Sequence, residues 1–332
     1  MEKNAKIYIA GHRGLVGGAL LRCLRAGGYT NLLIKAHSEL DLLDQVAVNT
    51  FFEQEKPEYV FLAAAKVGGI GANSTYPGDF IFQNTMIGFN VIHAAYKTGV
   101  KKLINLGSSC IYPKLAPQPM KEEYLLSGLL EPTNEAYAVA KISVIKLCTY
   151  YNKQYGTNYM SAMPTNLYGP GDNYDPEKSH VLPALIRKFH EAKISGSDRV
   201  TLWGDGSPRR EFLFSDDLAE ALVFLMQNNN ANDLSNLTGD FVNIGSGKDL
   251  TIKELAEKIR SVIYREMPSR MCDIVWDHSK PNGTPQKLLD ISRITALGFL
   301  PKIDLTEGIK LAYSNFISRF VYPTSTVLAH GK

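Results

Sequence analysis

The sequence predicts an α/β fold, a doubly wound parallel sheet followed by a smaller α/β lobe. Short apolar runs alternate with longer helical patterns through the first half, a glycine-rich turn follows the first run, and this regularity ends after about Asn166. Apolar runs of strand length without polar alternation indicate strands buried on both faces, as in parallel sheets covered by helices. The alternation of the two patterns favours helices on both faces of one sheet.

The expected elements can be placed in chain order. We expect strands at residues 6–10, 32–35, 59–64, 102–106 and 159–164, and helices at 15–25, 80–98 and 136–155. Glycine, proline and aspartate make 168–173 a loop, before a helix at 180–191 and a strand at 200–203. Segments 214–226 and 241–244 are expected to return to the large sheet.

Composition excludes several classes of protein. The 332 residues are 45% apolar and carry a net charge of +3, which is too little for a polyanion-binding surface and argues against a nucleic-acid partner. No apolar run approaches the ~18 residues of a membrane span, and the first residues lack a secretory apolar region. The four cysteines lie far apart, without metal-site or disulfide spacing. We therefore expect a cytoplasmic protein without metal.

A glycine turn follows the first expected strand. It reads Gly11-His12-Arg13-Gly14-Leu15-Val16-Gly17, in which glycines recur every three residues. Such a turn lets backbone N–H groups approach a pyrophosphate at the start of a helix. An ordinary strand–helix turn is the alternative, but the flanking strand and helix favour dinucleotide binding.

The end of the second strand bears on which dinucleotide binds. NAD sites usually place a carboxylate there, whereas this chain has Lys35-Ala36-His37-Ser38 and no carboxylate before Glu39. Arg13 in the glycine turn adds a cation suited to a 2′-phosphate. The pattern favours NADP, although Lys35 is also compatible with an ordinary surface lysine. We expect residues 1–167, rejoined by 214–244, to bind NADP, 168–213 with 245–325 to form the smaller lobe, and 326–332 to be a tail.

A tyrosine and a lysine suited to acid–base chemistry lie four residues apart in the long helix. Tyr137 and Lys141 share one helix face, and a nearby ammonium is expected to lower the pKa of the phenol. Ser108, just after the fourth strand, can hold a substrate carbonyl. The pair alone is common by chance, but it becomes specific together with the glycine turn and the serine.

These motifs resemble the extended short-chain dehydrogenase/reductases and, within them, the family of GDP-L-fucose synthases. The more specific matches are Ser108-Ser109-Cys110-Ile111-Tyr112-Pro113, residues 164–170 (Pro-Thr-Asn-Leu-Tyr-Gly-Pro) and residues 281–285 (Pro-Asn-Gly-Thr-Pro). The resemblance covers residues 6–320 and implies a Rossmann-type domain, a homodimer and a two-part reaction. GDP-4-keto-6-deoxy-D-mannose would be epimerised at C3 and C5 and then reduced at C4 by NADPH.

The resemblance also implies roles for individual residues. Ser108, Tyr137 and Lys141 would serve the reduction, while Cys110 would be the epimerisation base and His180 its acid. If the fourth strand continues, Ser108 and Cys110 point the same way. The substrate would contact Ser108, Ser109, Asn166, Lys188, Trp203, Arg210 and Asn282. The cofactor would lie against Gly11, His12, Arg13, Gly14, Leu15, Val16, Gly17, Lys35, His37, Asp41, Leu42, Ala63, Ala64, Leu106, Gly107, Lys141, Pro164, Asn166, Leu167 and His180.

Three positions depart from the pattern we expect of the family. Lys188 stands in place of an arginine, Asn282 in place of an aspartate, and His37 in place of a more basic residue. Two alternatives therefore remain open. One is a nucleotide-sugar 4,6-dehydratase or 4-epimerase, although a dehydratase needs an acidic pair after the strand-end hydroxyl. The other is a non-catalytic NADP-binding redox sensor, which would not need the tyrosine–lysine pair.

Overall fold

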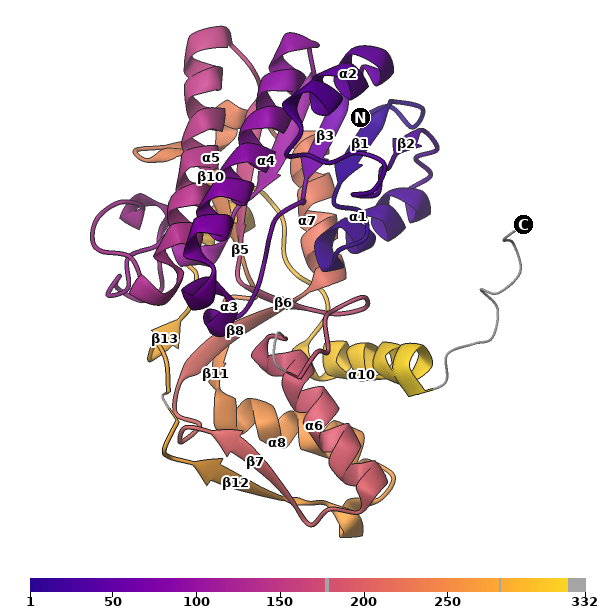
Figure 1. Ribbon diagram of the computed structural model, residues 1–332, viewed down its shortest axis with the longest axis vertical. Coiled ribbons are helices and arrows are strands. Elements are labelled where there is room, and N and C mark those ends of the chain that lie inside the picture. The colour runs from indigo at the N-terminus through magenta and orange to yellow at the C-terminus, as the bar shows by residue number, and fades with distance from the viewer. Residues whose placement is uncertain (177–178, 281, 322–332) are drawn as a thin grey trace.

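A computed structural model describes residues 1–176, 179–280 and 282–321, and its main feature is a seven-stranded sheet (Figure 1). The strand order is β2-β1-β3-β4-β5-β10-β9, and all neighbours are parallel except the last pair. The strands are β1 (Ile7–Ala10), β2 (Leu32–Leu33), β3 (Tyr59–Leu62), β4 (Lys102–Leu106), β5 (Tyr159–Pro164), β9 (Ser235–Asn236) and β10 (Gly239–Ile244). The predicted doubly wound parallel sheet is confirmed.

Helices cover both faces of this sheet, which explains the continuous apolar strands. Alternate β1 side chains face opposite ways: Ile7 and Ile9 join one core, Tyr8 and Ala10 another. The first core is closed by α1 (Leu15–Ala26) and α7 (Ser215–Asn228). The second is closed by α2 (Gln45–Glu55), α4 (Pro77–Lys97) and α5 (Glu135–Tyr155), which lie side by side in Figure 1.

Most expected elements appear within one to three residues of their expected ends. Strands β4 and β5 have the expected bounds, and β10 pairs with β5 as the return of 241–244 to the sheet requires. The second strand is shorter than expected, because β2 ends at Leu33 and not at Lys35. A short helix, α3 (Ile70–Thr75), lies before α4 and was not expected.

The rest of the described chain forms a smaller lobe with its own apolar core. A four-stranded sheet joins β6 (Asn166–Tyr168), β8 (Arg209–Phe214), β11 (Asp249–Thr251) and β13 (Gln286–Lys287). A two-stranded sheet joins β7 (Arg199–Trp203) and β12 (Asp273–Asp277), and the helices are α6 (Val181–Ser195), α8 (Ile252–Ile263) and α10 (Leu305–Phe316). Helix α9 (Ser292–Ala296) packs instead against β10, and its Ile294 joins the first core of the large sheet. The expected tail, 326–332, and residues 322–325 of the expected lobe lie outside the described residues. No helix in the described ranges is long and apolar enough to cross a membrane.

Candidate active site

The glycine turn packs against the sheet with no room for side chains. Gly11 has φ +86°, and a Cβ there would lie 2.8 Å from the backbone of Ala64. A Cβ on Gly17 would lie 2.1 Å from the Gly11 carbonyl oxygen. Helix α1 begins after Gly14, which offers no side chain to cap the first N–H groups. Those groups remain available to an anion, as a pyrophosphate site requires.

A cavity of about 570 Å³ opens beside this turn, within the size range of cofactor sites. It continues along the carboxyl ends of β3, β4 and β5, where ligands of open α/β sheets bind. The predicted site residues that line it are Gly11, Gly14, Leu15, Val16, Gly17, Ala63, Ala64, Leu106, Gly107, Ser108, Ser109, Tyr137, Lys141, Pro164, Asn166, Leu167 and His180.

The remaining predicted cofactor residues lie around the glycine turn and the end of β2, outside this lining. Burial lowers the pKa of His12, whose Nδ1 lacks a hydrogen-bond partner within the described ranges. Arg13 and His37 are exposed, and His37 Nδ1 lies 3.7 Å from Asp41 Oδ1. The Glu39 carboxylate accepts from the Ala36 N–H at 2.7 Å. The unpartnered His12 Nδ1 and the exposed side chains of Arg13 and His37 are nitrogen-bearing groups that fit the phosphates of a dinucleotide.

The predicted tyrosine, lysine and serine come together at the floor of the cavity. Lys141 is buried, and its Nζ donates to the Leu106 carbonyl at 2.8 Å and lies 5.7 Å from the centre of the Tyr137 ring. Phe80 of α4 packs edge-on against that ring at 6.2 Å. The end of β4 therefore fixes the lysine, and the lysine and Phe80 hold the tyrosine.

The expected lowering of the Tyr137 pKa by Lys141 is wrong, because this pKa is raised and Lys141 is not among the groups that shift it. Burial, with the nearby Cys110, raises the pKa of Tyr137 above its usual range, and hydrogen bonding to Ser108 counteracts this only in part. Burial also lowers the pKa of Lys141 to about 8. Desolvation is the largest cause of both shifts, because both side chains lie away from water. The phenol is therefore protonated at neutral pH, which is the form that can donate a proton.

Cys110 lies beside Ser108, but not for the expected reason. Strand β4 ends at Leu106, and a 3-10 helix, Ser109–Ile111, follows with Ser108 as its N-cap. This turn, and not a continued strand, brings Cys110 Sγ to 3.2 Å from Ser108 Oγ. Burial raises the pKa of the Cys110 thiol, while the Ser108 hydrogen bond and the charges of Lys287 and Lys141 lower it.

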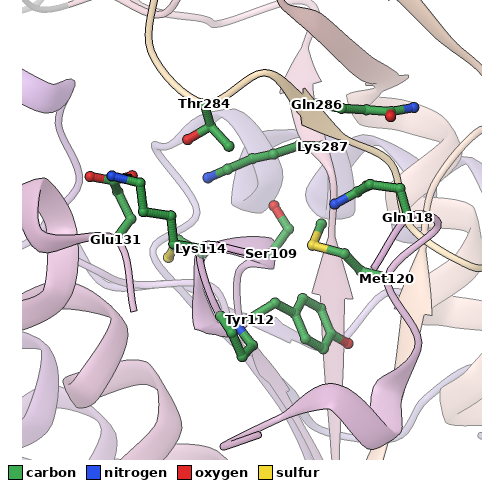
Figure 2. A pocket seen from close by; sticks show the side chains of 11 residues that line it. Ser109, Tyr112, Lys114, Gln118, Met120, Glu131, Thr284, Gln286 and Lys287 are labelled. Atoms are coloured by element: carbon green, nitrogen blue, oxygen red, sulfur yellow. Dashed lines mark ion pairs between the residues drawn. The ribbon is translucent and has the colours of Figure 1, made fainter. Parts of the chain in front are cut away.

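Lys287 was not predicted, yet it lies at the site. It belongs to β13 and pairs with Arg210 of β8. Figure 2 shows its side chain extending across a small cavity that Cys110 and Ser109 also line. Burial and the neighbouring Arg210 lower the pKa of Lys287, while Cys110 and Glu131 raise it. The only sequence signal was its position two residues after the 281–285 motif.

The other predicted substrate residues gather in the smaller lobe. Trp203 is 67% exposed at the end of β7, and Asn282 packs beside it, since its Oδ1 would lie 2.2 Å from a Cβ on Gly204. Lys188 of α6 donates to the Thr201 carbonyl at 3.2 Å, and burial lowers its pKa. Arg210 stands on the adjacent sheet. Together these residues offer an aromatic face and cations, as a nucleoside diphosphate requires.

His180 lines the large cavity at the start of α6, whereas Cys110 lines the small cavity, and Ser109 borders both. Desolvation lowers its pKa, so the imidazole is mostly neutral at pH 7. No group of three or more metal-binding side chains occurs within the described ranges.

Comparison with known proteins shows which family the chain belongs to. The model of the NAD dependent epimerase/dehydratase family matches residues 7–245. The chain belongs to this family. GDP-L-fucose synthase 1 of Arabidopsis thaliana is 56% identical over 316 residues, 95% of this chain and 94% of its own length. GDP-L-fucose synthase of Escherichia coli (strain K12) is 52% identical over 315 residues, 94% of this chain and 96% of its own length.

Among solved structures, a GDP-mannoheptose C4 reductase from Campylobacter jejuni with NADP bound has a TM-score of 0.87 and 41% identity. The likeness covers 95% of this chain and 99% of that one. The resemblance to GDP-L-fucose synthases that the motifs indicated is confirmed, and one solved relative is a reductase that acts at C4 of a GDP-linked sugar.

Proposed function

We propose that the protein is a bifunctional epimerase–reductase that converts GDP-4-keto-6-deoxy-D-mannose to GDP-L-fucose with NADPH. The observation that carries the proposal is the 3.2 Å approach of Cys110 Sγ to Ser108 Oγ. It places a proton-accepting group beside the hydroxyl that would hold the reducible carbonyl. One bound sugar can then meet both the epimerising and the reducing groups without leaving the site.

Cys110 and His180 act in the epimerisations. The 4-keto group acidifies the C–H bonds at C3 and C5, so a base on one face can remove a proton and leave its electron pair as an enolate. Cys110 takes that proton as a thiolate, and His180 returns one from the opposite face as an imidazolium, the minor form of this side chain at pH 7. Ser108 and Tyr137 donate hydrogen bonds to the oxygen where charge develops. Lys287 and Lys141 favour the thiolate electrostatically.

Tyr137 completes the reduction. NADPH supplies the hydride to C4 when it is bound. The protonated Tyr137 phenol donates its proton to the C4 oxygen, and its raised pKa keeps that proton in place until it is needed. Lys141 holds the geometry through the Leu106 carbonyl.

Two parts of the chain divide the binding. Residues 1–167, rejoined by 214–244, bind NADPH; the pairing of β10 with β5 and the packing of α7 in the same core as α1 support this assignment. The smaller lobe, 168–213 and 245–325, binds the GDP end. Arg210 and Lys188 serve the diphosphate and Trp203 the nucleoside, a role that its exposed ring and the nearby Lys280 ammonium support.

The protein acts as a homodimer in the cytoplasm. Helices α4 and α5 carry exposed apolar side chains, among them Phe82 (61% exposed) and Tyr150 (58%), and a second copy would cover them. The four cysteines are unpaired, in keeping with a reducing compartment. Light scattering of the purified protein measures the first point, and a Phe82→Lys variant that stays dimeric would exclude this face.

One assay tests the whole proposal. Purified protein is mixed with NADPH and GDP-4-keto-6-deoxy-D-mannose, the loss of NADPH absorbance is followed, and the product sugar is identified by NMR. GDP-L-fucose is the expected product. A sugar reduced without inversion at C3 and C5, or no NADPH consumption, would contradict the proposal. A dehydratase is disfavoured because Cys110 and Ile111, not carboxylates, follow the strand-end serines.

A further inference from the structure

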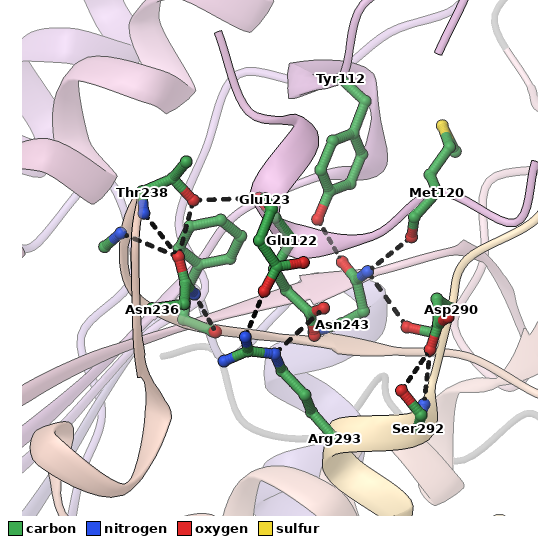
Figure 3. A network of polar contacts seen from close by, with 12 residues as sticks. Tyr112, Met120, Glu122, Glu123, Asn236, Thr238, Asn243, Asp290, Ser292 and Arg293 are labelled. Atoms are coloured by element: carbon green, nitrogen blue, oxygen red, sulfur yellow. Dashed lines mark hydrogen bonds and ion pairs between the residues drawn. The ribbon is translucent and has the colours of Figure 1, made fainter. Parts of the chain in front are cut away.

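A single buried amide, Asn243, joins two segments that carry site residues (Figure 3). Asn243 lies in β10 and has no exposed surface. Its Nδ2 donates to the Met120 carbonyl at 2.9 Å and to the Asp290 carbonyl at 3.1 Å, and its Oδ1 accepts from the Tyr112 hydroxyl. The side-chain amide therefore uses both of its donor hydrogens and its oxygen.

The two joined segments are the ones that place Cys110 and Lys287. Tyr112 follows Cys110 by two residues, and Asp290 follows Lys287 by three. The segments also bond directly, because Met120 N–H donates to the Leu288 carbonyl at 2.7 Å and Asp290 N–H to the Met120 carbonyl at 2.8 Å.

A carboxylate and a guanidinium hold the backbone of Asn243 in place. Glu122 is 2% exposed, and its Oε1 accepts from the Asn243 backbone N–H at 3.0 Å. Arg293 Nε lies 3.5 Å from Glu122 Oε2, and the Arg293 guanidinium also bonds Glu123. This network lies below the small cavity of Figure 2, and none of its polar side chains except the Tyr112 ring borders that cavity.

Such a connection sets a distance that the chemistry depends on. Cys110 and Lys287 come from segments about 177 residues apart in sequence, and their mutual approach determines how strongly the ammonium favours the thiolate. Tyr137 and Lys141 are placed by α5 and by the Leu106 carbonyl at the end of β4, whereas the Asn243 side chain bonds Tyr112, Met120 and Asp290 within the described ranges. A disturbance at Asn243 therefore acts first on the two segments that carry Cys110 and Lys287. Among the reducing groups it reaches Ser108, which bonds Cys110, before Tyr137 and Lys141.

We propose that Asn243, acting through Tyr112, is a positioning residue of the epimerisation half-reaction that holds Cys110 against Lys287 without touching the substrate. The proposal rests on the proposed function, in which Cys110 is the base. It assigns to this network the balance between epimerisation and reduction.

Tyr112→Phe is the test variant, because the ring stays in its apolar core and only the hydroxyl is lost. Tyr29→Phe is the matched control: Tyr29 is 3% exposed, and its hydroxyl bonds the Gln227 side-chain amide in the separate core between α1 and α7. Asn243→Ala is a second variant, which removes all three hydrogen bonds of the Asn243 side chain. Both tyrosine variants lose one hydrogen bond to a side-chain amide, which is buried at Tyr112 and partly buried at Tyr29.

Deuterium uptake at C3 and C5 of the substrate is measured by NMR without NADPH, and hydride transfer and product identity are measured with it. Tyr112→Phe is expected to slow uptake about tenfold, since a displacement of ~1 Å can cost ~10²-fold. Hydride transfer stays near wild type, and the share of unepimerised product rises. The pH dependence of uptake also shifts to higher pH, because Lys287 supports the thiolate less. Tyr29→Phe changes none of these ratios.

An equal fall in uptake and hydride transfer, an unchanged ratio, or the same change in Tyr29→Phe would overturn the positioning role. A parallel Cys110→Ser sample separates this failure from a failure of the proposed function. If Cys110→Ser exchanges normally, the proposed base is wrong. If Cys110→Ser is inactive in exchange but Tyr112→Phe matches wild type, only the role of Asn243 is lost.

Discussion

Replacing Cys110 by serine should separate the two half-reactions. The thiol is 9% exposed and bonds Ser108 Oγ, and a serine hydroxyl can occupy the same place with the same partner. The substitution exchanges one atom, so the 3-10 turn and its core should persist. Ser108, Tyr137, Lys141 and the glycine turn are untouched. Hydride transfer should therefore remain possible while proton abstraction fails.

The expected magnitude follows from the ionisation of the two groups. An ordinary thiol with a pKa of ~8.5 is roughly 3% thiolate at pH 7. Burial lowers this fraction at Cys110, and the Lys287 and Lys141 charges restore part of it. An alcohol gives essentially no alkoxide at this pH, and positioned general bases contribute ~10²–10⁴-fold. Exchange of the C3 and C5 protons should fall by at least ~10².

NMR in deuterated water follows this exchange directly. Without NADPH, the wild-type protein should incorporate deuterium at both C3 and C5. Cys110→Ser should incorporate deuterium at neither carbon at a comparable rate. With NADPH, the variant should yield, at least in part, a GDP-6-deoxy sugar that keeps the D configuration. If the variant labels both positions at the wild-type rate and still makes GDP-L-fucose, Cys110 is a packing residue and the reasoning is refuted.

The remaining predictions concern the reducing groups, the cofactor and pH. Tyr137→Phe should slow reduction by at least ~10² in stopped-flow absorbance while NADPH binding is kept; near-normal turnover would contradict its role as proton donor. Arg13→Gln should raise the Kd for NADPH in fluorescence titration much more than that for NADH, and equal losses would place Arg13 at the shared pyrophosphate. Reduction should decline above pH about 8, where Lys141 loses its proton and charge. Isotope exchange should instead stay nearly flat across neutral pH, because the His180 pKa is lowered and the Cys110 pKa is raised. A reduction rate that stays constant through pH 8 would argue against a role for the Lys141 charge.

Local pattern was enough to predict the large sheet. Strands β1 and β3 are continuous apolar runs, and β4 and β5 are apolar apart from Lys102, Asn105 and Ser161. Burial on both faces of the sheet favours such runs. The end of β2 was harder. The strand was expected to end at Lys35, but β2 ends at Leu33. The Ala36 N–H donates to the Glu39 carboxylate and not to a neighbouring strand, so the chain has left the sheet by this residue.

The candidate site was predictable where its residues sit in motifs and not where they depend on distant contacts. Tyr137 and Lys141 are set by helical spacing, but their pKa directions depend on burial, which spacing does not reveal. Cys110 was correctly predicted to lie beside Ser108, but a 3-10 turn and not the predicted continued strand brings the two together. Lys287 could not be found from the sequence, because β13 has only two residues and its pairing partner, β8, lies far away along the chain.

The tight packing of the glycine turn makes some of the predicted cofactor positions hard to substitute and leaves others free to vary. With under 3 Å around the missing Cβ atoms of Gly11 and Gly17, any side chain there would push the first helix off the sheet. The pyrophosphate cradle can therefore vary little without loss of the fold. Arg13 and His37 are exposed, and substitutions at exposed positions usually change stability little. A descendant of this protein could thus change its preference between the two nicotinamide dinucleotides by surface substitutions alone, leaving the scaffold and the chemistry of the sugar unchanged.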